Sequence, residues 1–595
     1  MPRRKRGRCS NWQEWNWSLS KMKWRPMKIS ERQRKRRMNR WEDGNGFRST
    51  PPPAHRDIKE STMRMLAIIT GITLIITPSF QTTAQPAFNI TFSQEAHSEP
   101  ITGRAYVMIS RDDEREPRLR IGTGGVPFFG KDIEAVNPGE AAVIDNEVMG
   151  YPVKSLQELP PGEYYVQGFV NIYTQFERSD GHTLWMHDDQ WEGQHFNRSP
   201  GNLYSDVQKI SIGQSMSGPI TLECKNVIPP IQMPPDTEWV KRIKFESKIL
   251  TEFWGQPVYL GATILLPKGY DEHPDTYYPV NYSQGHFSLR NPNGFMPGNA
   301  FGKYWTSDEA PRMISMTFQH PCPYYDDSYA VNSPNTGPYG DAIMQELIPA
   351  VEEQFRIIRE PYARILSGGS TGGWESLALQ ILHPDFFGGT FSLCPDPVDF
   401  RYFQAVNIYE DKNAYYKESG WVKVPTPSDR YTDGIVRLTY EQRNHMELTR
   451  GTKNRSGDQI DIFEAVFGPI GEDGYVKPLF DKLTGEIDPE VAAYWREHYD
   501  LRYYLEKNWS WLGPKLVGKL HIYTGDMDTY YLNNATKLLE DFLEKTTAPY
   551  YAGVVEYGDG EPHCWGPRGP DLYTLMSDHV VEHAPDGTDT ASWRY

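Results

Sequence analysis

The stretch "ARILSGGSTGGWESLALQILH" (363–383) constrains the fold more than any other part of the chain. It begins with a short apolar run, passes through a glycine-rich turn and continues with apolar residues at helical spacing. A buried strand that leads through a tight turn into a helix is typical of a parallel sheet covered by helices. We therefore expect an α/β architecture around this segment.

The same alternation of strands and helices continues on both sides of this segment. Strand-like runs include "YLGATILLP", "YPVNYSQ", "RMISMTF", "GGTFSLC", "KLHIYTGD" and "AGVVEYG", and "GDAIMQELIPAVEEQFR" has helical spacing. This pattern predicts a mostly parallel sheet with helices on both faces over residues 240–595. Residues 400–515 interrupt it and are rich in Tyr, Trp and charge. An insertion of this length at a strand end predicts a lid over a site.

Residues 86–226 have a different pattern. Runs such as "ITGRAYVMIS" and "YYVQGFVNIYTQF" alternate or are rich in β-branched and aromatic residues, and Gly/Pro turns separate them. We expect an all-β, sandwich-like domain here. The Pro-rich segment 227–239 then predicts a semi-rigid linker to the α/β part of the chain.

The N-terminal region holds most of the basic excess. Residues 1–62 contain 18 Lys and Arg but only 6 Asp and Glu, so this tail carries +12 and the rest of the chain −28. The segment that follows (63–84) has a short basic start, an apolar stretch and a small-residue cleavage site, which is the pattern of a secretory signal peptide. We expect a secreted or periplasmic protein without a stable membrane anchor after cleavage. The tail is then either absent from the mature protein or a basic arm.

The turn "GGSTGG" fits the pattern G-x-S-x-G, in which a serine is the nucleophile. Gly368 and Gly372 would provide clearance, because side chains at these positions would collide with the flanking strand and helix. The backbone N–H of Thr371 would point at a developing oxyanion from the start of the helix. The alternative is that Ser370 is only a structural turn residue.

A serine nucleophile needs a base and an acid, and in this fold they follow it along the chain. Asp528 stands in the loop after the strand "KLHIYTG", and Asp526 in the same loop is the second candidate for the acid. His563 lies in the loop after the last predicted strand. The sequence leaves open that Asp528 is only a helix N-cap and that His563 is an ordinary loop histidine.

Several segments between residues 245 and 583 resemble the putative esterase family of α/β-hydrolases, which includes enterochelin esterase, esterase D and feruloyl esterase domains. They are "ATILLPKGYDEHPDTYYPVNYSQGHF", "QELIPAVEEQFR", "GGSTGGWESLALQILHPDFFGG", "GDMDTYY" and "HCW". The resemblance implies a Ser370–His563–Asp528 triad. Where the family has His-Gly after its third strand this chain has Gly-His-Phe, so the second oxyanion N–H is assigned to His286 or Phe287.

The composition limits which partners and cofactors we expect this chain to bind. The net charge of −16 argues against a nucleic-acid partner, because phosphate contacts need clustered Lys and Arg. No Cys or His spacing indicates a zinc site, and a serine triad needs neither metal nor cofactor. In an oxidising compartment Cys394 and Cys564 are candidates for a disulfide, with free thiols as the alternative. The sequence does not indicate an oligomeric state.

These features together predict an exported serine esterase that acts on a small-molecule or carbohydrate-linked ester, with siderophore esters among the candidates. Two other interpretations remain. A prolyl-oligopeptidase-like serine peptidase shares the G-G-S-x-G-G turn, but the β region is too short for its propeller and shows no repeat. A non-catalytic carbohydrate- or surface-binding protein on a hydrolase scaffold would have lost its activity.

Overall fold

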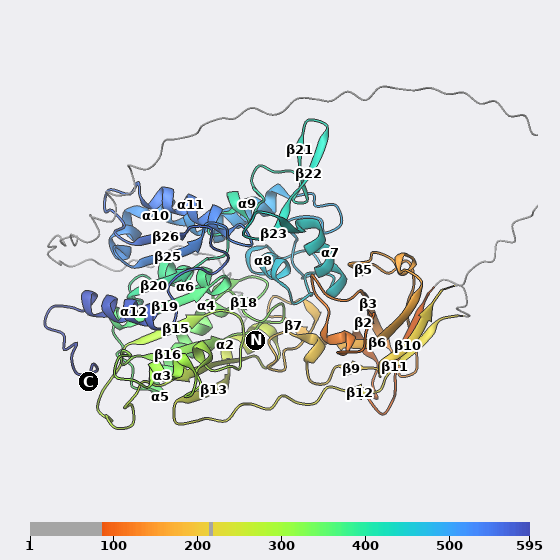
Figure 1. Cartoon of the computed structure of the whole chain (residues 1–595), viewed down its shortest axis with the longest axis horizontal. Helices are drawn as coiled ribbons and strands as arrows, with labels where there is room; N and C mark the ends of the chain where they lie inside the picture. Colours follow the sequence, from red (N-terminus) through yellow and green to blue (C-terminus); the bar gives the residue numbers. More distant parts are fainter. Residues whose placement is uncertain (1–85, 214–217) are drawn as a thin grey trace, which may run out of the picture. The chain divides into compact units, whose positions relative to one another are not determined.

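An eight-stranded sheet forms the centre of residues 240–558 (Figure 1). Its strands lie in the order β13-β14-β16-β15-β19-β20-β25-β26. β14 runs antiparallel to both of its neighbours, and all the pairs from β16 to β26 are parallel. The bounds are β13 (Val240–Glu246), β14 (Tyr259–Leu265), β15 (Val280–Gln284), β16 (Ile314–Gln319), β19 (Arg364–Gly369), β20 (Gly389–Leu393), β25 (Leu520–Gly525) and β26 (Val554–Gly558). The predicted α/β-hydrolase fold class is confirmed.

The computed structural model describes residues 86–213 and 218–595. The basic tail (1–62) and the predicted signal peptide (63–84) therefore lie outside the described residues. In the described part of the chain, no helix combines the length and the apolar character needed to cross a membrane.

The helices of this part alternate with the strands of the sheet. They are α2 (Lys248–Trp254), α3 (Ala300–Trp305), α4 (Tyr339–Ala342), η5 (Ile343–Leu347), α5 (Ile348–Gln354), α6 (Thr371–Leu382), α11 (Leu532–Leu543) and α12 (Pro570–His583). The segments α4, η5 and α5 continue one another, and η5 is a π-helical turn just before Pro349. Proline cannot donate an N–H to the preceding turn, which accounts for the local widening.

The strand order places a topological switch point between β15 and β19. The chain leaves β15 for β16 on one side and returns to β19 on the other. The connections after β15 and β19 therefore diverge, and ligands of open α/β sheets bind in the crevice at such a point. Ser370 follows β19 and His286 lies two residues beyond the end of β15.

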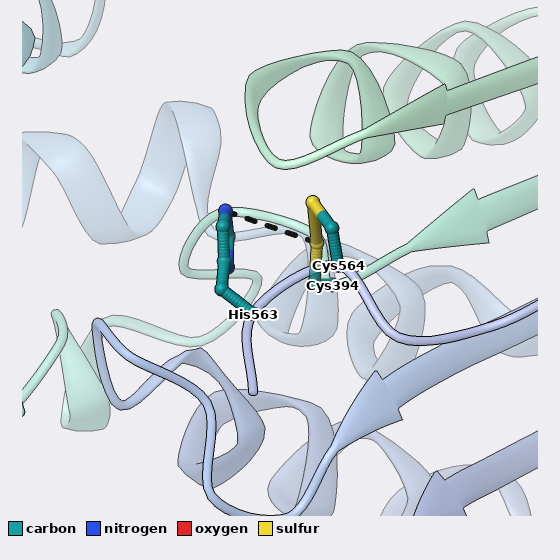
Figure 2. Close-up of side chains that lie close together, drawn as sticks. All are labelled: Cys394, His563 and Cys564. Atoms are coloured by element: carbon teal, nitrogen blue, oxygen red, sulfur yellow. Dashed lines mark hydrogen bonds between the residues drawn. A yellow bond between two sulfur atoms is a disulfide. The ribbon is translucent and has the colours of Figure 1, made fainter. Parts of the chain in front are cut away.

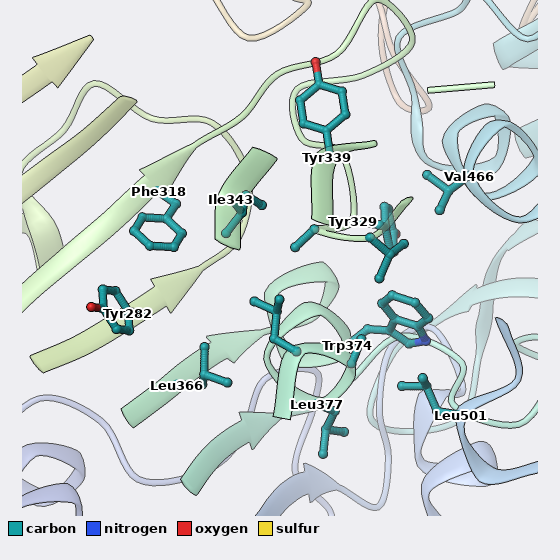
Figure 3. Close-up of a cluster of buried hydrophobic side chains, with 14 of the residues drawn as sticks. Tyr282, Phe318, Tyr329, Tyr339, Ile343, Leu366, Trp374, Leu377, Val466 and Leu501 are labelled. Atoms are coloured by element: carbon teal, nitrogen blue, oxygen red, sulfur yellow. The ribbon is translucent and has the colours of Figure 1, made fainter. Parts of the chain in front are cut away.

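One hydrophobic core joins the sheet to the inserted region (Figure 3). Tyr282 and Phe318 belong to the sheet, whereas Val466 and Leu501 belong to the inserted region, and all four lie in the same buried cluster. Trp374 of α6 packs against Phe467 of the inserted region in a tilted arrangement, with ring centroids 5.1 Å apart. The inserted residues are thus packed onto the helix that begins at the predicted nucleophile.

The insertion separates β20 from β25. Its elements are η7 (Phe400–Tyr402), β21 (Tyr416–Ser419), β22 (Val422–Pro425), β23 (Pro427–Arg430), β24 (Val436–Thr439), α7 (Tyr440–Arg450), α8 (Gln459–Phe467), α9 (Pro489–Tyr499) and α10 (Leu501–Leu516). Asp500 forms the N-cap of α10 and accepts a hydrogen bond from the Tyr503 N–H at 2.8 Å. α10 packs against α6 and α11, so it belongs to the helical layer that leads into β25.

Antiparallel pairing dominates the N-terminal described region, as the sequence predicts. One sheet has the order β11-β1-β4, and a second has the order β12-β9-β6-β2-β3-β5 with β10 beside β6. A buried cluster lies between them and includes Phe88, Val107 and Leu222. The bounds are β1 (Phe88–Phe92), β2 (Ile101–Ser110), β3 (Phe128–Val136), β4 (Ala142–Ile144), β5 (Gly150–Tyr151), β6 (Gly162–Ile172), β7 (Thr174–Glu177), β8 (Thr183–Met186), β9 (Leu203–Tyr204), β10 (Gln208–Ile212), β11 (Ile220–Cys224) and β12 (Asn226–Val227).

The β region contacts the end of α7. Arg104 is 3% exposed, and its guanidinium donates to the carbonyl oxygen of Thr449 at 2.9 Å and to Asp132 at 2.7 Å. The hydroxyl of Tyr106 donates to the carbonyl oxygen of Arg450. The last carbonyls of a helix have no partner within the helix, and a cation near them is favourable. The β region therefore caps a helix of the insertion.

We expect Arg104→Ala to lower the free energy of unfolding by about 2–3 kcal/mol, because it leaves buried helix-end carbonyls without a donor. Urea unfolding followed by intrinsic fluorescence measures the change. Lys209→Ala removes an exposed lysine that pairs with Glu163 and serves as the control. Equal stability of the two variants would contradict the capping role.

Candidate active site

Ser370 occupies the turn between β19 and α6. Its backbone has φ 58° and ψ −122°, a conformation that costs energy for a residue with a side chain. Two backbone hydrogen bonds hold the turn, from the Ser370 N–H to Leu393 at 2.9 Å and from the Trp374 N–H to Ser370 at 3.1 Å. Strain at a serine between a strand and a helix is the geometry of a nucleophile elbow.

The glycines around Ser370 are required by close approaches of the backbone. A Cβ atom at Gly368 would lie 2.2 Å from the carbonyl oxygen of Gly372. A Cβ atom at Gly372 would lie 2.2 Å from the carbonyl oxygen of Gln284, at the end of β15. Any side chain at either position would force the strand, the turn or the helix to move.

His563 and Asp528 meet at the carboxyl ends of the last two strands. The Nδ1–H of His563 donates to Oδ2 of Asp528 at 2.7 Å. Asp528 is fully buried, and its other oxygen accepts the N–H groups of Tyr530 at 2.8 Å and Leu532 at 3.2 Å. The proton on Nδ1 leaves Nε2 free to accept a proton, because a neutral imidazole carries only one.

Asp526 makes a different contact from Asp528. Its Oδ1 accepts the N–H of Gly560 at 2.7 Å, which ties the loop after β25 to the loop that carries His563. The structure thus places Asp528, and not the second candidate Asp526, in contact with the imidazole. Asp528 also receives N–H groups at the start of α11, so one carboxylate contacts both the helix start and the imidazole.

The structure does not join Ser370 to His563 by a hydrogen bond. The Ser370 hydroxyl instead donates to Oδ1 of Asp396 at 3.4 Å. Asp396 is buried beyond the end of β20, and its Oδ2 accepts the hydroxyls of Tyr329 at 2.7 Å and Thr371 at 2.9 Å. Burial raises the pKa of Asp396 above its ordinary value, while the hydrogen bonds from Tyr329 and Thr371 oppose this rise.

Sequence reasoning missed Asp396 and the groups that hold it. Gln459 begins α8 in the insertion, and its amide donates to the Tyr329 hydroxyl and to Asp396 at 3.4 Å. Asp396 follows a predicted strand, and ligands of open α/β sheets bind outside such strand ends. Tyr329 and Gln459 carry no such indication, because only the folded loops bring them beside Ser370.

Cys394 and Cys564 form a disulfide in the structure, across 170 residues of sequence (Figure 2). Cys394 directly follows β20, and Cys564 directly follows His563. Figure 2 shows the His563 ring beside the sulfur atoms, with Nε2 of His563 3.9 Å from Sγ of Cys394. The bridge therefore anchors the loop of the imidazole to the strand next to the nucleophile strand.

The predicted oxyanion groups lie around the same turn. Thr371 is the first residue of α6, and its N–H belongs to the helix end that has no partner within the helix. His286 and Phe287 follow β15, across the crevice from the turn. The Phe287 ring packs against Trp191 of the β region, with centroids 5.1 Å apart. The β region thus supports the loop that carries both candidates.

Part of the α/β region is similar in sequence to a known protein family. Residues 259–450 match the model of a family described as Putative esterase. The predicted family resemblance is confirmed for this segment. The matched segment includes the Ser370 turn and ends before Asp528 and His563. A search of curated proteins gives no match.

Solved structures with similar coordinates cover more than half of the chain. A ferulic acid esterase matches 58% of this chain and 98% of its own at 14% identity and a TM-score of 0.33. FphF, a fluorophosphonate-binding serine hydrolase from Staphylococcus aureus, matches 57% and 98% at 15% identity and a TM-score of 0.33. An S-formylglutathione hydrolase from Agrobacterium tumefaciens matches 58% and 96% at 13% identity and a TM-score of 0.32.

We expect Asp528→Asn to lower kcat/KM for p-nitrophenyl acetate by about 10³–10⁴-fold, because the amide no longer fixes the Nδ1–H tautomer. Asp526→Asn is the matched control, since it removes a charge from the same loop without touching His563. We expect it to retain activity within about tenfold. A larger loss in Asp526→Asn than in Asp528→Asn would reverse the assignment of the acid.

Proposed function

We propose that this chain is an exported serine esterase that cleaves carboxylic esters through Ser370, His563 and Asp528. The observation that carries the proposal is the Asp528–His563 hydrogen bond of 2.7 Å beside the strained Ser370 turn. The match of residues 259–450 to an esterase family supports the same reaction class. Three residue types in catalytic order, each at a strand end, fit acyl transfer better than a structural turn.

In the proposed reaction, Nε2 of His563 takes the proton of the Ser370 hydroxyl while the oxygen attacks the ester carbonyl. Asp528 holds the Nδ1–H tautomer and stabilises the imidazolium that forms. The N–H of Thr371, with that of His286 or Phe287, stabilises the tetrahedral oxyanion. The imidazolium then protonates the leaving alcohol, and water attacks the acyl-enzyme in the same way.

The hydroxyl of Ser370 has to turn before it reacts. It donates to Asp396 in the structure, and the reaction requires it to donate to Nε2 of His563 instead. Hydrogen bonds of catalytic residues are often long or misaligned until a substrate is bound. We infer that Asp396 holds the resting hydroxyl and that an entering ester carbonyl displaces it toward the imidazole.

We propose a class of substrate rather than a single compound. Small-molecule esters and carbohydrate-linked esters are the proposed substrates, with siderophore esters as a further candidate. The insertion supplies Gln459 to the surroundings of Ser370, so it would shape the pocket for the acyl or alcohol group. The peptidase alternative loses support, because the described β region forms sheets of three, seven and two strands rather than the four-stranded blades of a propeller.

We expect Ser370→Ala to lower turnover of p-nitrophenyl acetate by about 10³-fold or more, because no other group can form the acyl-enzyme. Labelling by a fluorophosphonate probe should disappear with it. Ser376→Ala is the matched control, since Ser376 lies on the same helix and donates only to the carbonyl of Gly373. Undiminished turnover in Ser370→Ala would refute the proposal.

The substrate class is then measured with a panel of acetylated and feruloylated sugars, siderophore esters and short acyl esters. A Ser370-dependent rate on one group of esters identifies the class. A protein that folds normally but hydrolyses none of them and resists the fluorophosphonate probe would favour the non-catalytic binding protein.

We also propose that the chain is exported and that residues 1–84 are absent from the mature protein. The sequence pattern of residues 63–84 supports this, and a disulfide is typical of an oxidising compartment. N-terminal sequencing of the protein recovered from the medium or periplasm should then begin near Gln85. A mature chain that begins near Met1 would contradict it.

A further inference from the structure

Three metal-ligating side chains meet on the rim of the crevice, outside the proposed triad. His286 follows β15, and Asp326 and Asp327 lie in the loop after β16. Nδ1 of His286 is 3.0 Å from Oδ1 of Asp326 and 3.2 Å from Oδ2 of Asp327. Each of the three residues offers one ligand atom, and these atoms all lie within 4.8 Å of one another.

These separations fit one small divalent ion. Zinc binds imidazole nitrogen and carboxylate oxygen at about 2.0–2.2 Å, which places two ligands of a tetrahedral site about 3.3 Å apart. The His286 side chain is 45% exposed, whereas those of Asp326 and Asp327 are 11% and 1% exposed. An ion would therefore enter from the solvent side and keep a position for water or another ligand.

Two buried acidic groups, Asp327 in the cluster and Glu375 near it, have few partners. Oδ2 of Asp327 is buried and contacts Nδ1 of His286 at 3.2 Å, and Oδ1 accepts the N–H of Tyr329 at 3.2 Å. Glu375 of α6 is fully buried, and neither of its carboxylate oxygens has a hydrogen-bond partner. Burying a carboxylate is costly unless a cation or donors compensate it.

The carboxylate of Glu375 interacts electrostatically with this cluster. Its electrostatic neighbours are Asp327, His286, Asp326 and Asp396. It also lies 3.9 Å from Nε2 of His320, a distance too long for a hydrogen bond. One imidazole, that of His286, is therefore the basic group in direct contact with Asp326 and Asp327.

We propose that His286, Asp326 and Asp327 form a binding site for a divalent transition-metal ion such as Zn²⁺, with Glu375 as the buried acidic group behind it. The mixture of one imidazole and two carboxylates suits Zn²⁺ or Mn²⁺ better than the all-oxygen sites of Ca²⁺ and Mg²⁺. The ion would offset the negative charge of these carboxylates. They lie near the end of β15, which is followed by His286 and Phe287, the candidates for the second oxyanion N–H. The site is independent of whether Ser370 is catalytic.

The test uses the full chain, freed of metal with a chelator and kept oxidised so that Cys394 and Cys564 stay paired. Calorimetric titration with Zn²⁺ should show a site whose affinity falls at least about tenfold in Asp326→Asn and in Asp327→Asn. Asp180→Asn is the matched control, since Asp180 lies 3.1 Å from Nδ1 of His182 without a second carboxylate on that histidine. We expect the control to bind Zn²⁺ as the wild type does.

A second measurement needs no variant. Zn²⁺ should slow the modification of His286 by diethylpyrocarbonate in the wild-type protein, read by peptide mass mapping, and leave the modification of His182 unchanged. Equal Zn²⁺ affinity in wild type and both variants, or unprotected His286 at saturating Zn²⁺, would overturn the proposal. Either result would leave the bridge between His286 and the two aspartates as an ion pair only.

Discussion

The close packing of the first turn of α6 against the end of β15 is the constraint on which the site depends. A Cβ atom at Gly372 would lie 2.2 Å from the carbonyl oxygen of Gln284, so helix and strand meet backbone to backbone. This approach places the strained Ser370 and the loop of His286 on the two sides of the switch-point crevice. Because protein interiors are close-packed, a shift of an ångström is energetically costly. The positions of Ser370 and of the His286 loop are therefore fixed relative to each other, and the remaining groups are arranged around them.

Three other parts of the chain contribute groups to the surroundings of that pair. The loops after β25 and β26 bring the Asp528–His563 pair, and the disulfide fastens the second of these loops to the end of β20. The insertion brings Gln459, and the β region holds the helix that precedes it through Arg104. The crevice is thus built by segments from the β region to the last strand.

Acidic groups are concentrated near the predicted nucleophile. Asp396 holds the Ser370 hydroxyl, and Asp326, Asp327 and Glu375 lie beyond it. A negative oxyanion in such surroundings needs donors or a cation to compensate the carboxylates. The proposed esterase mechanism relies on backbone N–H groups for this purpose, and the proposed metal site would add a positive charge behind them.

The α/β architecture, the turn at Ser370 and the candidate acid and base could be predicted from the sequence, because strand and helix periodicity and strand-end positions are local properties. The sequence left two questions open: whether Asp526 or Asp528 contacts the histidine, and whether Cys394 and Cys564 form a disulfide. Only the tertiary structure put Asp528 on His563, joined Cys394 to Cys564 and brought Asp396 to Ser370. Those contacts depend on how loops that are distant in the sequence pack against one another. No local pattern in the sequence determines how close such loops come.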